Sequence, residues 1–372
     1  MRQRSHITKR METTEMKKAQ RVMARASMRK VAGTLGVAAM LSAGLALTSV
    51  GARADSGSQV QLYGIVGTYV GSVKRSDTPQ STVLIGSGGL TTSFWGIRGK
   101  EDLGGGVSAI FALESFFQPQ NGAQGRNATD PFFSRNAYVG FQGDFGQLTF
   151  GRQRNPTYTA ESLINPFSSS TVFSPLVLQT FVTNYGGTII GDTVWNNTAK
   201  YTTPDFKGFG ATVIYGLGGV AGSPGVGNLG AHLNYQGHGL TAVVSGQRVR
   251  YTAAGPVGAQ YAYLAGAAYD FKLVTLYGAW AMTSDVSTPT GSHTYEAGFS
   301  IPFTPADFLL AEWARTQRSG PTHTTNSLRN TAALGYDHLL SKRTDIYAIY
   351  SIDKLSDHPI GNTFAVGIRH TF

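Results

Sequence analysis

Residues 362–372 read NTFAVGIRHTF, and this stretch decides the fold because two kinds of side chain alternate along it. One set of positions is mainly large and apolar: Phe364, Val366, Ile368, His370 and Phe372. The other set is small or polar: Ala365, Gly367, Arg369 and Thr371. Successive side chains of a β-strand point to opposite faces, so the pattern predicts a strand with one apolar and one polar face.

Similar alternation recurs from residue 59 to the end of the chain. Trp95 and Ile97, for example, alternate with Gly96 and Arg98. Runs of about ten mixed residues are separated by clusters of Gly, Asp or Pro, which favour turns. We predict about sixteen strands, an even number, that begin near Val60, Thr92, Val107, Arg135, Gln147, Thr198, Phe209, Leu229, Leu240, Gln260, Leu273, Thr294, Ala306, Arg329, Arg343 and Asn362.

The links between these strands are of two kinds that alternate along the sequence. One kind is short and rich in turn-forming residues: 102–106, 144–146, 204–208, 237–239, 270–272, 303–305 and 339–342. The other kind is longer and irregular, as in 73–90, 118–134, 154–197 and 218–228. This order places all short turns at one rim and all long loops at the other, which is typical of outer-membrane β-barrels.

A closed barrel also accounts for the composition. Apolar residues make up only 41 % of the chain, which includes 17 Tyr and 20 Phe. In hydrocarbon every backbone polar group needs an internal partner, and a closed sheet supplies one for each without leaving an edge. The sequence therefore predicts an all-β fold, a transmembrane antiparallel β-barrel with girdles of aromatic residues.

Residues 1–54 have the order of a secretory signal peptide. A basic stretch ends at Lys30, an apolar stretch covers 31–50, and small residues at Ala52 and Ala54 precede Asp55. We expect cleavage after Ala54, with the barrel domain in 55–372. An uncleaved membrane helix over 31–50 is the alternative. The basic stretch is long, so that Met16 and Met28 are alternative translation starts.

The formal net charge of +10 belongs mostly to this leader. The leader holds 11 of the 31 Lys and Arg and two of the 21 Asp and Glu, which leaves 20 basic and 19 acidic residues in the rest of the chain. A nearly neutral body excludes a broad basic surface for nucleic acid. The lack of cysteine excludes disulfides and thiolate sites.

Catalytic and metal-binding motifs are absent from the sequence. It contains no G-x-S-x-G, no H-E-x-x-H and no Cys/His cluster, and its eight His are scattered. The glycine pairs in 86–89 and 216–219 are not followed by a helical pattern, unlike phosphate-binding loops. We therefore expect no cofactor, no metal and no enzymatic activity. A Ser/His/Asp hydrolase built into the barrel is the remaining catalytic alternative.

Several motifs resemble those of one family in their order and spacing. They are 62–64 (LYG), 95–99 (WGIRG), 101–106 (EDLGGG), 112–114 (ALE), 135–140 (RNAYVG), 150–153 (FGRQ), 340–345 (LSKRTD) and 367–372 (GIRHTF). The chain resembles the Gram-negative general porins, in particular the trimeric sixteen-stranded type of β-proteobacteria. The resemblance implies an outer-membrane channel for passive diffusion of ions and small hydrophilic solutes, assembled as a homotrimer.

The resemblance also implies where the channel narrows. A long third loop folds into the lumen in this family, and residues 154–194, which follow the GRQ motif, fit that loop. Basic residues then line one wall opposite acidic groups on the loop. Matching of motifs places Arg98 and Arg135 on the basic wall, with Lys200 as a third candidate. Glu161 is the expected acidic counterpart, and Phe372 the expected C-terminal signal for the outer-membrane assembly machinery.

One position departs from the family pattern. Phe94 stands where the family commonly has arginine, and alternation directs its side chain toward the lumen with Gly96 and Arg98. The lost charge argues against strong anion selectivity. Arg152 and Arg154 are ambiguous, because alternation groups them with the apolar residues of their strand unless the chain turns inward there.

Two other channel or barrel functions remain open at this stage. A substrate-specific channel for sugars or carboxylates would need an aromatic path or a denser set of basic residues. A structural or adhesive barrel would have a plugged lumen. Conductance across a planar bilayer separates these alternatives from an open general channel.

Overall fold

The computed structural model describes residues 59–219, 227–251, 258–320 and 327–372, and the predicted signal peptide lies outside them. In this part the chain forms sixteen long strands, the predicted number. They are β1 Gln59–Val73, β3 Phe94–Asp102, β4 Ser108–Gln118, β6 Asn136–Gly143, β7 Gly146–Arg154, β8 Val194–Thr202, β9 Phe209–Gly216, β10 Asn228–Gly237, β11 Leu240–Tyr251, β12 Gly258–Asp270, β13 Thr275–Asp285, β14 Gly291–Pro302, β15 Asp307–Ser319, β16 Leu328–Ser341, β17 Thr344–Leu355 and β18 Gly361–Thr371. Two short strands, β2 Thr82–Ser87 and β5 Ala123–Gln124, lie within loops and were not predicted.

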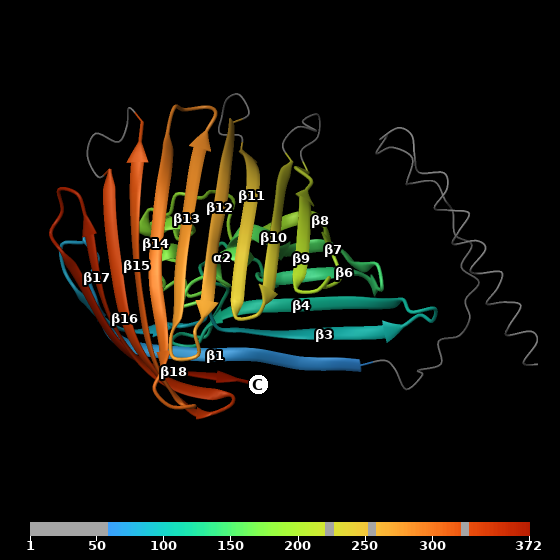
Figure 1. Ribbon diagram of the computed structural model, residues 1–372, viewed down its shortest axis with the longest axis horizontal. Helices are drawn as coiled ribbons and strands as arrows, with labels where there is room; N and C mark the ends of the chain where they lie inside the picture. Colours follow the sequence, from blue (N-terminus) through green and yellow to red (C-terminus); the bar gives the residue numbers. More distant parts are fainter. Residues whose placement is uncertain (1–58, 220–226, 252–257, 321–326) are drawn as a thin grey trace, which may run out of the picture. The chain divides into compact units, whose positions relative to one another are not determined.

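Neighbouring strands pair antiparallel, and the sheet closes on itself between β1 and β18. At the closure, Ile65 of β1 pairs with Phe94 of β3 on one side and with Thr371 of β18 on the other. Gly64 and Phe372 exchange two backbone hydrogen bonds of 3.2 and 3.0 Å. The predicted closed barrel is therefore confirmed, and Figure 1 shows β10 to β17 side by side in its wall.

The two faces of each strand differ as the alternation predicts. In β18 the outward side chains of Phe364 and Val366 are 54 % and 49 % exposed, whereas inward Ala365 is fully buried. The outward face is apolar and meets lipid, and the inward face lines the lumen. None of the helices in the described ranges has the length and apolar character needed to cross a membrane.

In the described ranges the helical segments all lie in the link between β7 and β8. They are α2 Pro156–Glu161, α3 Pro175–Thr180 and the 3₁₀ turn η1 Thr183–Tyr185. We call residues 155–193, which contain them, the third loop. Figure 1 shows α2 inside the ring of strands. Each helix has only six residues, too few for a periodic apolar pattern, which is why the sequence did not predict them.

The aromatic residues of the third loop pack against the inner wall of the barrel. Phe167 and Phe173 are 2 % and 1 % exposed, and they form one buried cluster with wall residues that include Tyr69 and Tyr347. The ring centroid of Phe173 lies 5.2 Å from that of Tyr69 and 6.1 Å from that of Tyr347. The loop thus has an apolar core of its own inside the lumen.

Candidate functional site in the lumen

The third loop turns inward directly after β7. Asn155 accepts a hydrogen bond from the Thr157 backbone N–H and caps α2, and Pro156 occupies the first helical turn, where its missing N–H costs nothing. The Asn155 side-chain amide donates to Gln247 of β11 over 2.8 Å, and the Thr157 and Ser245 hydroxyls are 2.8 Å apart. The start of the loop is therefore fixed to the β11 wall.

The second half of the loop is fixed to β15 and β16. Ser174 caps α3, and its hydroxyl also donates to Glu312 over 3.0 Å. The Leu176 backbone N–H donates to the same carboxylate over 2.7 Å. The Gln179 amide donates to the Ala314 carbonyl over 3.0 Å. With both halves held on this side, the loop leaves its opening against the wall of β3, β4, β6 and β7.

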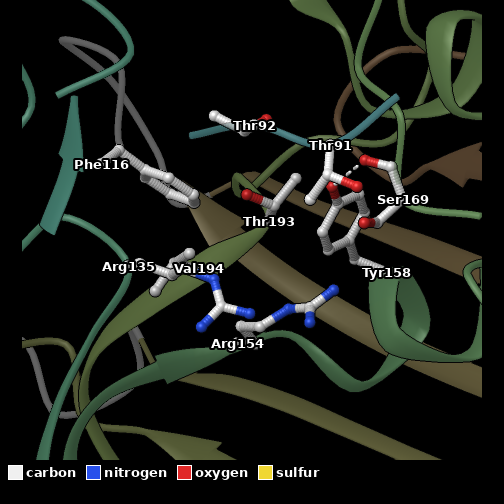
Figure 2. A pocket seen from close by; sticks show the side chains of 9 residues that line it. All are labelled: Thr91, Thr92, Phe116, Arg135, Arg154, Tyr158, Ser169, Thr193 and Val194. Atoms are coloured by element: carbon white, nitrogen blue, oxygen red, sulfur yellow. Dashed lines mark hydrogen bonds between the residues drawn. The ribbon is translucent and has the colours of Figure 1, made fainter. Parts of the chain in front are cut away.

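A cavity of about 20 Å³, close to the space that one water molecule occupies, lies between the loop and the wall. Figure 2 shows the side chains around it: Thr91, Thr92, Phe116, Arg135, Arg154, Tyr158, Ser169, Thr193 and Val194. Two guanidinium groups lie on the wall side, and the loop side presents Tyr158, Ser169 and Thr193. We call this cavity the constriction.

Arg135 precedes β6 and is held at both ends of its guanidinium group. Its Nη1 lies 2.5 Å from Glu114 Oε2, and its Cζ lies 3.9 Å from the centroid of the Phe94 ring. Glu114 is buried on the inner face of β4 and also accepts hydrogen bonds from Tyr63 and Asn136. The positive charge of Arg135 therefore has an adjacent negative charge.

Arg154, the last residue of β7, faces the same cavity without such compensation. Its guanidinium Cζ lies 5.0 Å from the Tyr158 ring centroid, and its backbone N–H donates to Asn136 over 3.2 Å. Across the described ranges, no carboxylate lies within ion-pair distance of the Arg154 guanidinium. Its full charge is thus directed into the constriction.

Two further basic side chains face the lumen, one from β8 and one from β3. Lys200 of β8 lies with its Nζ 6.0 Å from the Tyr138 ring centroid. Arg98 of β3 donates to Gln61 over 2.8 and 3.0 Å and lies over the Tyr63 ring at 4.7 Å. Among the described residues neither side chain forms an ion pair. Arg154, Lys200 and Arg98 therefore form a group of positive charges without ion-pair partners in the described ranges, which we call the basic wall.

Comparison with known proteins assigns the family. The family model described as Gram-negative porin matches residues 38–358, more than half of the chain. The chain belongs to the Gram-negative porins. Outer membrane porin protein 32 of Delftia acidovorans is 29 % identical over 322 residues, which cover 84 % of this porin and 89 % of that protein. An outer membrane porin protein of Bordetella pertussis is 29 % identical over 394 residues, which cover 90 % of this porin and 99 % of that protein.

The fold comparison agrees with the family. The structure of an anion-selective porin from Comamonas acidovorans superposes on this porin with a TM-score of 0.71 at 26 % identity, and the match covers 85 % of this chain and all of that one. The predicted family, fold and location are thereby confirmed. This porin is an outer-membrane channel with a closed barrel.

The structure brings together some of the predicted constriction residues and separates others. Arg135 lines the constriction, and Phe94 lies inward against it, 6 % exposed. Arg152 does not line the constriction. Its guanidinium donates to the Ser134 carbonyl over 2.8 Å and to Asn196 over 2.6 Å, on the side of the strand opposite to buried Gln153.

The expected acidic counterpart, Glu161, does not face the basic wall. Its side chain is fully buried between the loop and the opposite wall, where one oxygen accepts a hydrogen bond of 2.9 Å from Thr180. The sequence identified Glu161 as the only carboxylate near the start of the loop, but it lies at the end of α2, on the face that packs against the barrel. The loop surface at the constriction carries hydroxyl groups instead.

Two functional residues were missed by the sequence reasoning. The sequence analysis gave Glu114 only as part of the family motif 112–114. Glu114 lies two positions after buried Ala112 on β4, so alternation places both side chains on the inward face. Asp192, near the end of the loop, forms an ion pair of 2.7 Å with Arg126 of the preceding long loop. Burial raises the pKa of Asp192, but its hydrogen bonds and ion pair with Arg126 outweigh this, so the pKa is lowered overall. No sequence pattern indicated that pairing.

Proposed function

We propose that this porin is a non-catalytic diffusion channel that prefers small anions. The observation that carries the proposal is the basic wall at and below the constriction, where Arg154, Lys200 and Arg98 lack acidic partners among the described residues. Fixed positive charge at a narrow, water-filled passage raises the local concentration of anions and lowers that of cations.

The side chains that the loop contributes to the constriction also support a preference for anions. Tyr158, Ser169 and Thr193 provide dipoles that stabilise ions of either charge, whereas a carboxylate there would favour cations. The relative from Comamonas acidovorans is described as anion-selective. Phe94 stands where the family commonly has arginine, so one positive charge is missing at that position. Arg154, whose orientation was ambiguous from the sequence, supplies a positive charge at the constriction.

The experiment is a reversal potential in a gradient of potassium chloride across a planar bilayer. We expect a permeability ratio that favours chloride, and we expect Arg154→Gln to lower it by up to about sixteen-fold. One unit charge at ~5 Å in water changes the local concentration of each ion about four-fold, in opposite directions for chloride and potassium. Lys272→Gln is the control, because it removes the same charge at an exposed short turn and does not line the constriction. A wild-type channel that prefers potassium would overturn the proposal.

We also propose that three copies assemble through the faces of β1, β2 and β18. The outward positions of these strands carry Val70, Val83, Ile85 and Phe364, each more than half exposed, and no Tyr or Trp within the described ranges. Tyr and Trp mark contact with the lipid interface, so their lack supports a protein contact. Native mass spectrometry in detergent tests the assembly, and a stable monomer contradicts it.

Phe372 is proposed as the signal read by the outer-membrane assembly machinery. Its side chain remains 41 % exposed, on the outward face of the closing strand. Replacement by alanine should reduce the amount of folded protein in outer-membrane fractions while refolding of purified protein in detergent is retained. Equal amounts of both proteins in those fractions would contradict this role.

A further inference from the structure

A row of polar side chains crosses the outward face of the barrel near its long loops. Arg315 of β15 pairs directly with Asn330 of β16, and Asn330 pairs with Lys354 of β17. All three positions alternate with buried inward residues, so their side chains point away from the lumen. Neighbouring strands are about 4.8 Å apart, which places Arg315 and Lys354 about 10 Å apart across Asn330.

The next outward row toward the short turns is apolar. It consists of Trp313, Ala332 and Ile352, which pair with one another in the same order. Trp313 and Ile352 are each 39 % exposed. Residues two positions apart on a strand differ by about 7 Å, so a polar row lies directly above an apolar row.

The height of the polar row fits the edge of the membrane. Arg315 lies eight residues beyond Asp307, where β15 begins after a short turn. Eight residues span about 26 Å along a strand, or about 20 Å in height at a tilt of ~40°. The apolar band of an outer-membrane barrel is about 25 Å tall, so the row lies close to its external boundary.

The charges of the row are positive and are not balanced on that face. In the described ranges of β13 to β17, the only acidic residue at an outward position is Asp307, at the opposite end of the barrel. The Arg315 side chain is exposed, and Lys354 donates to the His358 carbonyl. Tyr295, which pairs with Arg315 on the other side, is 48 % exposed.

We propose that Arg315, Asn330 and Lys354 bind the phosphate headgroup of a lipid in the external leaflet, with Trp313 and Ile352 contacting its acyl chain. Two cations and an amide donor suit a phosphomonoester, which carries more than one negative charge near neutral pH. An amphipathic ligand also explains why the polar and apolar rows lie on the same strands. This surface faces lipid and is separate from the constriction.

The test compares lipid binding by wild-type protein and by Arg315→Gln/Lys354→Gln. Detergent-solubilised protein is titrated with diphosphoryl lipid A, and separately with phosphatidylglycerol and phosphatidylcholine, and bound lipid is counted by native mass spectrometry. The control variant is Lys207→Gln/Lys272→Gln, because both lysines lie at short turns on the opposite rim. Single-channel conductance verifies that every variant folds.

We expect wild-type and control protein to retain lipid A, and the Arg315→Gln/Lys354→Gln variant to bind it at least about ten-fold more weakly. Conductance and ion selectivity should be unchanged in that variant, which separates this proposal from the one on anion preference. Equal lipid A binding by the two double variants would overturn the proposal. Preference for phosphatidylglycerol over lipid A would overturn the assignment to a phosphomonoester.

Discussion

Arg135 and Arg154 line the same cavity, but their electrostatic surroundings differ. Arg135 lies between the Phe94 ring and the Glu114 carboxylate, whereas Arg154 contacts only a tyrosine ring with its charged group. An ion in the passage therefore meets a nearly neutral pair and one full positive charge. The number of arginines at a constriction is a poor measure of its field unless their acidic neighbours are counted too.

Removing the carboxylate should therefore increase anion preference. In Glu114→Gln the Arg135 charge loses its adjacent partner. The single amide oxygen can still accept from Asn136, while the amide NH2 replaces the oxygen that accepts from Tyr63 and can donate to its hydroxyl instead. We expect the chloride-to-potassium permeability ratio to rise by up to about sixteen-fold, about four-fold from each ion. Glu101→Gln, an exposed carboxylate near a short turn, serves as control. A fall in the ratio for Glu114→Gln would contradict this account of the pair.

Because the carboxyl group of Glu161 is buried, we predict that the stability of the folded barrel depends on pH. Burial, partly offset by the Thr180 hydrogen bond and reinforced by the charge of Glu312, raises the pKa of Glu161 well above its ordinary 4.5. A group whose folded pKa is raised adds stability below its unfolded pKa, and that stability is lost as pH rises through the folded value. The barrel should therefore lose thermal stability as pH rises above about 4.5.

The measurement is the temperature at which the compact form disappears on semi-native gels, followed across pH. Glu161→Gln should reduce the decline with pH, because an amide does not ionise. If the wild-type protein became more stable over that range and Glu161→Gln removed the gain, the assignment would be wrong.

At the level of elements, the third loop depends on a small number of buried polar contacts. Glu312 accepts from both the Leu176 N–H and the Ser174 hydroxyl, which are the first turn and the cap of α3. Glu312→Ala leaves the buried Leu176 N–H without a partner, at a cost of about 1–3 kcal/mol, and leaves the Ser174 hydroxyl only its 3.3 Å contact with Asn165. We expect a looser loop, seen as increased current noise and a larger single-channel conductance.

The control for this loop variant is Gln317→Ala, on the same strand but with an outward, exposed side chain. It should leave both noise and conductance at wild-type values. Unchanged current traces in Glu312→Ala would show that the contacts of Glu312 are not needed to hold the loop.

The strands could be predicted from the sequence far better than the loop. Strand starts were located within a few residues because alternation and turn clusters are local signals, as in β9 and β11, which begin at the predicted Phe209 and Leu240. The path of the third loop depends on contacts with distant strands, such as that of Gln179 with β15. The inward placement of Arg154 follows a register shift between Gly151 and Gln153 in the pairing of β7 with β8, which strict alternation does not predict.

At the scale of the whole molecule, one closed sheet separates two environments. The outward face meets lipid, with its aromatic residues and the polar row of β15 to β17, while the inward face holds the loop and the basic wall. The composition is consistent with this division. Apolar outward residues and polar inward residues together give an apolar fraction that resembles that of a soluble protein. The composition could not indicate where charges lie around the lumen, since that depends on which strands the loop covers.

The pairing of Gly64 with Phe372 has a consequence for biogenesis. The two strands that pair there, β1 and β18, are the first and the last strands of the described chain, so the barrel cannot close before residue 372 is available for pairing. Until then the periplasmic intermediate carries two unpaired strand margins that attract other extended chains. We expect chaperones to bind these unpaired strand edges and periplasmic proteases to cleave near them. The closed barrel has no unpaired edge for either to bind.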